Sequence, residues 1–191
     1  MCSSDLVTDA LARALAQQPL DVPVDCIEDY ATDSGYIAAL ADSIRRSKRF
    51  REASPMIIFS FHGIPMSQHR SGDPYADQCR ATAKLVAAQL DLPVDRWRVT
   101  FQSRFGPLPW LQPYTDITMT ELPGQGITDV LVVCPGFSVD CLETIEEIRV
   151  LNRELFLEAG GEHFNYVRAL NASRAHARLL ADLISRRLVT Q

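Results

Sequence analysis

The chain has 191 residues and a mass of 21.3 kDa, which suits one large domain or one and a half small ones. Its formal net charge is −5, so no basic excess is present to neutralise nucleic-acid phosphates. Five cysteines form no CxxC pair, which is typical of reduced thiols in a cytosolic protein rather than of a disulfide framework. No signal peptide and no apolar stretch of membrane-spanning length is visible. The composition therefore predicts a cytoplasmic protein without a transmembrane segment.

The first fifty residues do not begin a complete folding unit. Residues 1–6 lack a hydrophobic pattern, and we interpret them as a non-native leader, with a disordered natural terminus as the alternative. Residues 7–18 predict a helix and 22–30 a strand, while 35–48 have apolar side chains at helical spacing and a basic end. We assign residues 7–50 to the tail of a second, similar α/β domain and a crossing helix.

From residue 51 onward, strands and helices alternate. Short runs rich in β-branched and aromatic residues, stopped by Gly or Pro, predict strands, and apolar stripes at steps of three and four predict helices. The predicted strands are 56–62, 97–102, 128–134 and 163–167, and the predicted helices are 76–90, 115–122, 142–159 and 173–188. This order predicts an α/β fold with a doubly wound parallel sheet. We assign residues 51–170 to this domain and 171–191 to a closing helix.

Two polar residues stand where predicted strands end. His62 closes the first strand, and Glu143 begins the helix that follows the third. Because the carboxyl ends of parallel strands share one edge, where ligands bind, we expect the two side chains to face the same crevice. A neutral imidazole and a carboxylate in that arrangement can bind a divalent metal or move protons. The simpler alternative is a strand-end histidine that is hydrogen-bonded within the protein.

The acidic start of the 142–159 helix has two interpretations. Asp140 is a good N-cap, and Glu143 follows at the spacing of a capping box. On a wheel of about 100° per residue, however, Asp140, Glu143 and Glu147 fall within about 60° of one another. A row of carboxylates beside a buried face is costly unless a cation or protons occupy it. The row indicates a metal or proton path, with capping and a solvated acidic face as alternatives.

The stretch 101–110 combines polar donors with aromatic side chains at the end of the second strand. Loop and core packing could explain it. Read as a binding surface, Phe105, Trp110 and Phe137 offer flat apolar area for an aromatic ligand. Arg104 offers a partner for the carboxylates of such a ligand. The candidate substrate-binding residues are Gln102, Ser103, Arg104, Trp110 and Phe137.

Other catalytic patterns are missing from the sequence. GxSxG, the motif of α/β-hydrolases, does not occur. Gly124 and Gly126 lack the third glycine of a dinucleotide loop. His62, His69 and Cys79 do not have the spacing of a zinc site.

Several motifs resemble those of the ferrochelatase family and follow the family's order. They are SFHGIP at 60–65, TFQSRFG at 100–106, PWL at 109–111, PYTD at 113–116, CPGF at 134–137 followed by ET at 143–144, GG at 160–161 and ALN at 169–171. The resemblance runs from about residue 22 to 184 and covers the carboxyl-terminal half, or slightly more, of a ferrochelatase. Since the family has two similar α/β domains around a porphyrin cleft, it implies that the amino-terminal half of the same protein is missing here.

The resemblance also implies roles for individual residues. The family's metal-site histidine falls on His62 and its essential glutamate on Glu143, so both are candidate catalytic and metal-binding residues. The acidic line of the family's metal path falls on Asp140 and Glu147. Which of His62 and Glu143 accepts protons and which delivers iron stays open.

The implied reaction is the insertion of Fe²⁺ into protoporphyrin IX to form protohaem, the last step of haem biosynthesis. The expected partners are porphyrin and Fe²⁺, with Fe²⁺ as a substrate and no cofactor. No cysteine follows Cys141, so no iron–sulfur cluster is expected. The alternatives are a coproporphyrin or sirohydrochlorin chelatase, or a non-catalytic tetrapyrrole-binding module. A fragment with one wall of the cleft is expected to be inactive alone.

Overall fold

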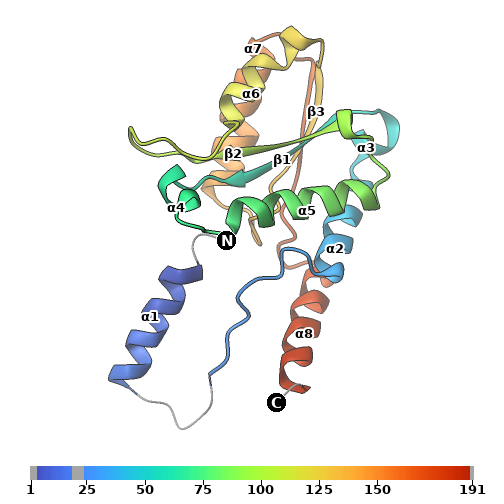
Figure 1. Ribbon diagram of the computed structural model, residues 1–191. Helices are drawn as coiled ribbons and strands as arrows, with labels where there is room; N and C mark the ends of the chain where they lie inside the picture. The colour runs from blue at the N-terminus through green and yellow to red at the C-terminus, as the bar shows by residue number, and fades with distance from the viewer. Residues whose placement is uncertain (1–3, 19–23, 190–191) are drawn as a thin grey trace.

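The fold centres on a four-stranded parallel sheet. The computed structural model describes residues 4–18 and 24–189. The strand order is β2-β1-β3-β4, and every neighbouring pair is parallel (Figure 1). The strands are β1 (Met56–His62), β2 (Trp97–Gln102), β3 (Asp129–Val133) and β4 (His163–Val167). All four predicted strands of residues 51–170 are confirmed.

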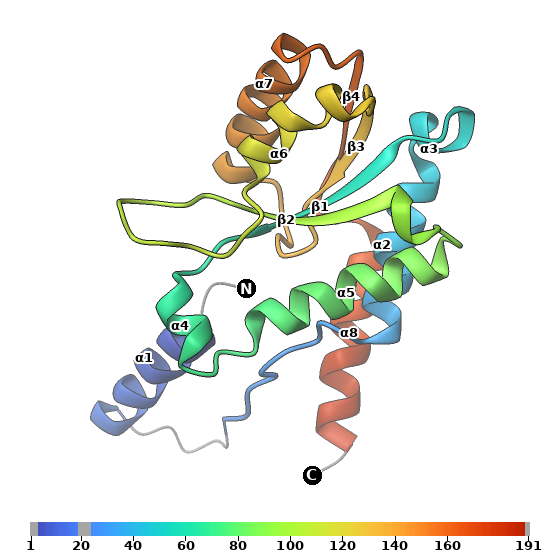
Figure 2. The same cartoon turned by 45° about the horizontal axis from the view of Figure 1, so that its top comes forward.

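Helices cover both faces of the sheet, as Figures 1 and 2 show. One face packs against α2 (Ser34–Arg46), α5 (Tyr75–Gln89) and α8 (Arg174–Val189), and the other against α6 (Thr115–Glu121), η3 (Glu143–Asn152) and α7 (Arg153–Glu158). Along β1, Ile57 and Phe59 face the first cluster, whereas Met56 and Ile58 face the second. A strand buried on both faces reads as a continuous apolar run. The doubly wound α/β prediction is confirmed.

The remaining helices complete the chain. They are α1 (Ser4–Gln17), α3 (Lys48–Glu52), α4 (Met66–Arg70), η1 (Val94–Arg96) and η2 (Pro123–Gln125). Helix α1 begins inside the predicted leader 1–6, whose first three residues lie outside the described part of the chain. Among the described residues, no helix is long and apolar enough to cross a bilayer.

Two amino-terminal predictions need correction. Residues 24–30 are irregular rather than a strand, and 22 and 23 lie outside the described residues. Asp25 pairs with Arg187 of α8, so this segment lies beside a helix, where it finds no strand to bond its backbone. The helix predicted over 35–48 is interrupted because Ser47 is extended (φ −62°, ψ 128°).

The helix predicted over 142–159 is α-helical only in part. Residues Glu143–Asn152 form a π-helix, which continues into α7. A π-helix has i→i+5 hydrogen bonds and is frequent at functional sites. The Asn152 side chain, at its end, donates to the Glu147 carbonyl at 2.8 Å. Because the turn is wider than an α-helical turn, the 100° wheel does not describe where the acidic side chains point.

The packing of α7 against the turn that follows it gives a stability prediction. A Cβ added at Gly161 would lie 2.2 Å from Cε1 of Phe156, a ring with 0% exposure. Gly161→Ala should therefore lower the free energy of unfolding by about 2 kcal/mol, measured by urea denaturation. Gly124→Ala is the matched control, because its Cβ would meet no atom within 4 Å. Equal effects of the two substitutions would contradict this packing.

Candidate functional site

A buried glutamine holds the site together at the carboxyl edge of the sheet. Gln102 pairs in register with His62, since β1 and β2 end side by side. Gln102 is 3% exposed. Its Nε2 donates to the Glu143 carbonyl at 2.7 Å, and its Oε1 accepts from the Ser60 hydroxyl at 2.8 Å. The start of η3 is thereby tied to two strand ends, and the amide of Gln102 is used within the protein.

His62 is half-buried at the end of β1. Its Nδ1 lies 2.6 Å from the carbonyl oxygen of Gly63. A carbonyl can only accept, so Nδ1 donates this hydrogen bond, and in the tautomer that does so the lone pair lies on Nε2. The imidazole can therefore bind a metal ion or accept a proton through Nε2.

Glu143 lies near enough to this imidazole for the ring to affect the pKa of its carboxyl. The pKa of its carboxyl is lowered chiefly by a hydrogen bond from the Cys141 thiol, then by its own backbone N–H, with a smaller contribution from His62, while burial acts in the opposite direction. Glu143 is therefore ionised at neutral pH. Burial raises the pKa of Cys141, and Glu143 raises it further, so the thiol stays protonated and can donate.

Asp140 is directed away from this pair. Its carboxylate accepts hydrogen bonds from the Tyr166 hydroxyl (2.8 Å), the Ala169 N–H (3.1 Å) and the Asn171 amide (2.9 Å). The backbone N–H of Asp140 donates to Asn171 Oδ1 at 2.9 Å. A capping box between Asp140 and Glu143 is therefore wrong, because the N–H that Glu143 would accept from is already bonded to Asn171.

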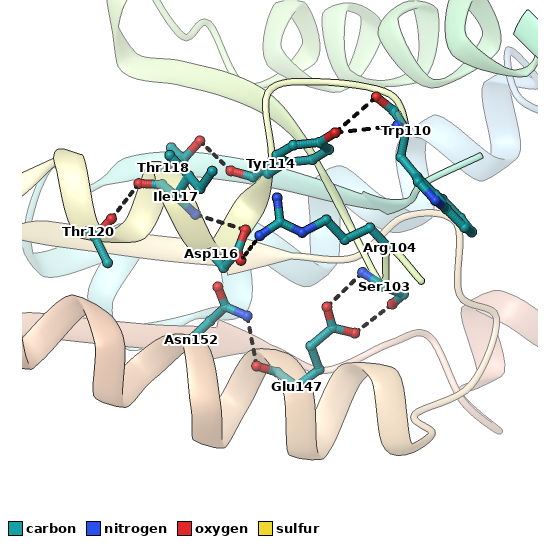
Figure 3. A network of polar contacts seen from close by, with 10 residues as sticks. All are labelled: Ser103, Arg104, Trp110, Tyr114, Asp116, Ile117, Thr118, Thr120, Glu147 and Asn152. Atoms are coloured by element: carbon teal, nitrogen blue, oxygen red, sulfur yellow. Dashed lines mark hydrogen bonds and ion pairs between the residues drawn. The ribbon is translucent and has the colours of Figure 1, made fainter. Parts of the chain in front are cut away.

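Glu147 is held from the opposite side. Both of its carboxylate oxygens accept from Ser103, one from the backbone N–H at 2.7 Å and one from the hydroxyl at 2.5 Å (Figure 3). Ser103 has a φ of 61°, a left-handed conformation that is uncommon outside glycine. The loop after β2 is thus fastened to the π-helix.

The three carboxylates consequently diverge. Asp140 is bound beyond the end of β4, Glu143 faces the end of β1, and Glu147 is bound at the end of β2. Within the described part of the chain, no group of three or more His, Cys, Asp or Glu side chains could hold a metal ion. Asp140 and Glu147 therefore do not form a single acidic row with Glu143, and His62 with Glu143 is left as the candidate pair.

Two aromatic rings lie near the imidazole of His62. The ring centroids of Trp110 and Phe137 are 6.4 and 6.3 Å from the imidazole centroid. Trp110 Nε1 donates to the Phe105 carbonyl at 2.9 Å, and the ring of Phe105 is 85% exposed. These rings from two loops offer flat apolar surface beside the imidazole.

Arg104 is already paired with residues at the start of α6. Its Nη2 donates to Asp116 at 2.7 Å, and its guanidinium lies 4.2 Å from the Tyr114 ring centroid (Figure 3). A ligand carboxylate would therefore compete with Asp116 for this side chain.

Three residues that shape the site were not selected from the sequence pattern. Cys141 donates to Glu143, and Tyr166 and Asn171 anchor Asp140. Asn171 lies in one of the family-like segments. Its hydrogen bonds to Asp140, however, depend on the path that the chain takes after β4. Tyr166 is a strand aromatic of ordinary appearance. The buried Cys134, whose pKa is raised by burial, donates weakly to Gln102 at 3.4 Å.

The fold and the site define an α/β protein with an imidazole and an ionised carboxylate at the carboxyl edge of a parallel sheet. The family model described as Ferrochelatase matches residues 1–188. The chain therefore belongs to the ferrochelatase family.

Curated relatives share close to half of the residues. A ferrochelatase of Aeromonas hydrophila is 48% identical over 182 residues, which cover 95% of this chain and 56% of the relative. A ferrochelatase of Vibrio cholerae is 48% identical over 93% of this chain and 56% of its own length. A coproporphyrin III ferrochelatase of Streptococcus mutans is 46% identical, with 95% and 56% covered. The chain spans about half the length of these relatives.

Among solved structures, one titled as a cobalamin biosynthesis CbiX protein from Marinobacter aquaeolei VT8 aligns with a TM-score of 0.47 at 16% identity. The alignment covers 71% of this chain and 98% of that one. This similarity is too weak to support a functional inference.

The anchoring of Asp140 gives a pH-dependent prediction. The hydrogen bonds of Asn171, Tyr166 and Ala169 outweigh the opposing effect of burial and lower the pKa of Asp140 below its usual value. The unfolded chain therefore binds this proton more readily, so the carboxylate stabilises the fold near neutral pH and loses that effect as the pH falls through the folded-state pKa. Asp140→Asn should lower the free energy of unfolding by about 2 kcal/mol at neutral pH.

Chemical denaturation across the pH range measures this effect. The difference in the free energy of unfolding between the unsubstituted chain and Asp140→Asn should shrink as the pH falls below about 4. Asp95→Asn, at an exposed position, serves as the control and should change stability by less than about 0.5 kcal/mol. A difference for Asp140→Asn that stays constant down to acid pH would contradict the proposed anchoring by its charge.

Proposed function

We propose that this chain forms the metal-inserting part of a ferrochelatase that places Fe²⁺ in protoporphyrin IX and yields protohaem, the last step of haem biosynthesis. The observation that carries the proposal is the His62 imidazole beside the ionised Glu143 carboxylate, in a chain that belongs to this family. We further propose a cytoplasmic enzyme that needs no cofactor, with Fe²⁺ as a substrate.

The chemistry requires a base and a metal ligand at one place. Insertion of Fe²⁺ releases two protons from the pyrrole nitrogens of the porphyrin. The two positive charges that leave as protons balance the two that the metal brings. The lone pair on Nε2 of His62 can accept one proton at a time or bind the metal. The carboxylate of Glu143 can bind Fe²⁺ while it loses water. We assign His62 as proton acceptor or metal ligand, and Glu143 as the residue that delivers the metal or conducts protons.

The two outer carboxylates differ in their availability. Glu147 can join the path only when it releases Ser103, because both oxygens already accept from that residue. Asp140 has four structural donors, because the Thr144 hydroxyl also donates to its carboxylate at 3.3 Å. We therefore propose that Glu147 extends the metal or proton path and that Asp140 contributes mainly by fixing the start of the π-helix.

Exposed apolar side chains favour a flat, apolar substrate. On the β2 side, Phe105 is 85% and Leu108 is 65% exposed, and before η3, Val139 is 56% and Leu142 is 77% exposed. Apolar side chains gathered in this way usually mark a binding surface. With Trp110, they could contact the face of a porphyrin while His62 and Glu143 approach its nitrogens.

The remaining part of the family's length is proposed to supply a second wall. This chain spans only 56% of the Aeromonas relative. Apolar residues are exposed on the 24–30 segment and on α8, as expected for a surface that another part of the protein covers. They are Val24, Ile27, Leu180, Ile184 and Leu188. Because distortion of a macrocycle needs contacts on both faces, the chain alone should be inactive or nearly so.

The second candidate is insertion of iron into coproporphyrin. It is favoured by the Streptococcus mutans relative, which is named a coproporphyrin III ferrochelatase and is 46% identical. Porphyrins differ in their peripheral carboxylates, so the choice depends on residues that contact the edge of the macrocycle. Parallel assays with both porphyrins would separate the two candidates.

The central role of His62 gives a direct activity prediction. The assay would use a chimera, in which this chain is joined to the part of the Aeromonas ferrochelatase that it does not match. Insertion of Fe²⁺ or Zn²⁺ into the porphyrin would be measured by absorbance. His62→Ala should lower turnover about 100-fold or more, because the ring supplies the proton acceptor or metal ligand. His163→Ala, an exposed histidine on β4, should keep normal turnover. Retention of more than about a tenth of the rate by His62→Ala would refute the assignment.

A companion substitution separates charge from shape at Glu143. Glu143→Gln keeps the size of the side chain, and the carboxylate is not part of a capping box. The free energy of unfolding should therefore change by less than about 1 kcal/mol. Insertion in the same chimera should still fall sharply, because the amide has no negative charge for the metal. If turnover survives, Glu143 is not part of the reaction.

A further inference from the structure

A hollow separate from His62 lies over the edge strand of the sheet. It has a volume of about 530 Å³ and is lined by Arg149, Arg153, Phe164, Asn165, Tyr166 and Arg168. The first two arginines come from the η3–α7 helix, and the other four residues from β4 and the residue after it. A volume of this size is typical of sites for small molecules.

Three guanidinium groups gather there, and only that of Arg168 has an acidic partner among the described residues. No hydrogen bond or ion pair joins the side chain of Arg149 or Arg153 to any other described residue. Arg168 approaches Asp140 only at 3.8 Å, and its side chain is 76% exposed. Arg149 and Arg153 are four residues apart, and like charges on neighbouring turns repel. In a chain of net charge −5, this gathering of positive charge is unusual.

The floor of the hollow is aromatic and rigid. Phe164 and Tyr166 lie on one face of β4 and pack partly against the smaller core cluster. The Tyr166 hydroxyl is fixed by its hydrogen bond to Asp140 at 2.8 Å, and the Phe164 ring contacts Phe156 at 6.1 Å between centroids. Because β4 ends the described strand order, one side of its backbone has no neighbouring strand. A flat ligand could rest on the rings while its charged groups reach the arginines.

We propose that this hollow binds a small polyanion that carries at least two carboxylate or phosphate groups, and that it favours one with a flat apolar body. Guanidinium groups pair with both kinds of anion through two parallel hydrogen bonds. The negative groups would relieve the repulsion between Arg149 and Arg153, and the aromatic floor would add contact area. The inference is independent of metal insertion, since none of the lining residues belongs to the His62–Glu143 pair.

Three probes test which kind of anion the hollow binds. Calorimetric titration would use benzene-1,3,5-tricarboxylate, which is flat, citrate, which is not, and inorganic pyrophosphate. We expect saturable binding of one molecule per chain with a Kd below about 1 mM, weaker at high salt. The flat tricarboxylate should bind more tightly than citrate. Amide NMR signals of residues 163–168 should shift during the titration.

Substitutions locate the binding. Arg149→Gln and Arg153→Gln should each weaken it about tenfold, because each removes a charge-assisted pair. Arg178→Gln, an exposed arginine of α8, is the matched control and should bind as the unsubstituted chain does. His62→Ala should also leave this binding unchanged, which separates it from the proposed metal chemistry.

Several outcomes would overturn the proposal. They are the lack of saturable binding by all three probes, equal binding by the Arg149→Gln and Arg178→Gln proteins, and NMR shifts confined to residues outside 149–168. Binding to vesicles of anionic phospholipid with no binding of the small probes would likewise reject a small-ligand site and indicate a surface for lipid headgroups.

Discussion

The hydrogen bonds of the Gln102 amide are the interaction on which the site depends. This buried side chain bonds to Ser60 of β1 and to the backbone of Glu143 at the start of η3, and it accepts from Cys134 after β3. It therefore fixes where the π-helix begins relative to His62. A buried amide is stable only when its donors and acceptors are all paired, so this network has little freedom to shift. Precise placement of Glu143 follows from the pairing.

The π-helix and the turn before it direct their acidic residues to different strand ends. Asp140 is bound near β4, Glu143 faces β1, and Glu147 is fastened to Ser103 at β2. This arrangement avoids the repulsion that a single row of carboxylates would produce. It also leaves only Glu143 directly available to His62, while Glu147 depends on the loop that carries the aromatic surface. Movement of that loop and use of Glu147 are thereby linked.

Local patterns predicted the four strands of the sheet, because burial on both faces acts through short segments. The rule for parallel strand ends placed His62 and Glu143 at one edge, and their joint role stays a prediction. Local patterns did not predict the π-helix, since a sequence of ordinary helical spacing carries no mark of i→i+5 bonding. The capping box failed because Asn171, 31 residues further on, bonds the backbone of Asp140. The strand expected before residue 30 failed for a similar reason. Whether that segment forms a strand depends on a neighbouring strand, and the residues of the segment itself do not encode such a neighbour.

The most direct test of the central claim is the place where a divalent ion binds on the folded chain. Mn²⁺ can be added to chain with isotope-labelled histidine and glutamate, because this ion broadens NMR signals most strongly near its site. We expect the side-chain signals of His62 and Glu143 to broaden first, and Glu143→Gln to abolish the effect on His62. Broadening centred on other acidic residues, with His62 unaffected, would contradict the assignment of this pair as the metal site.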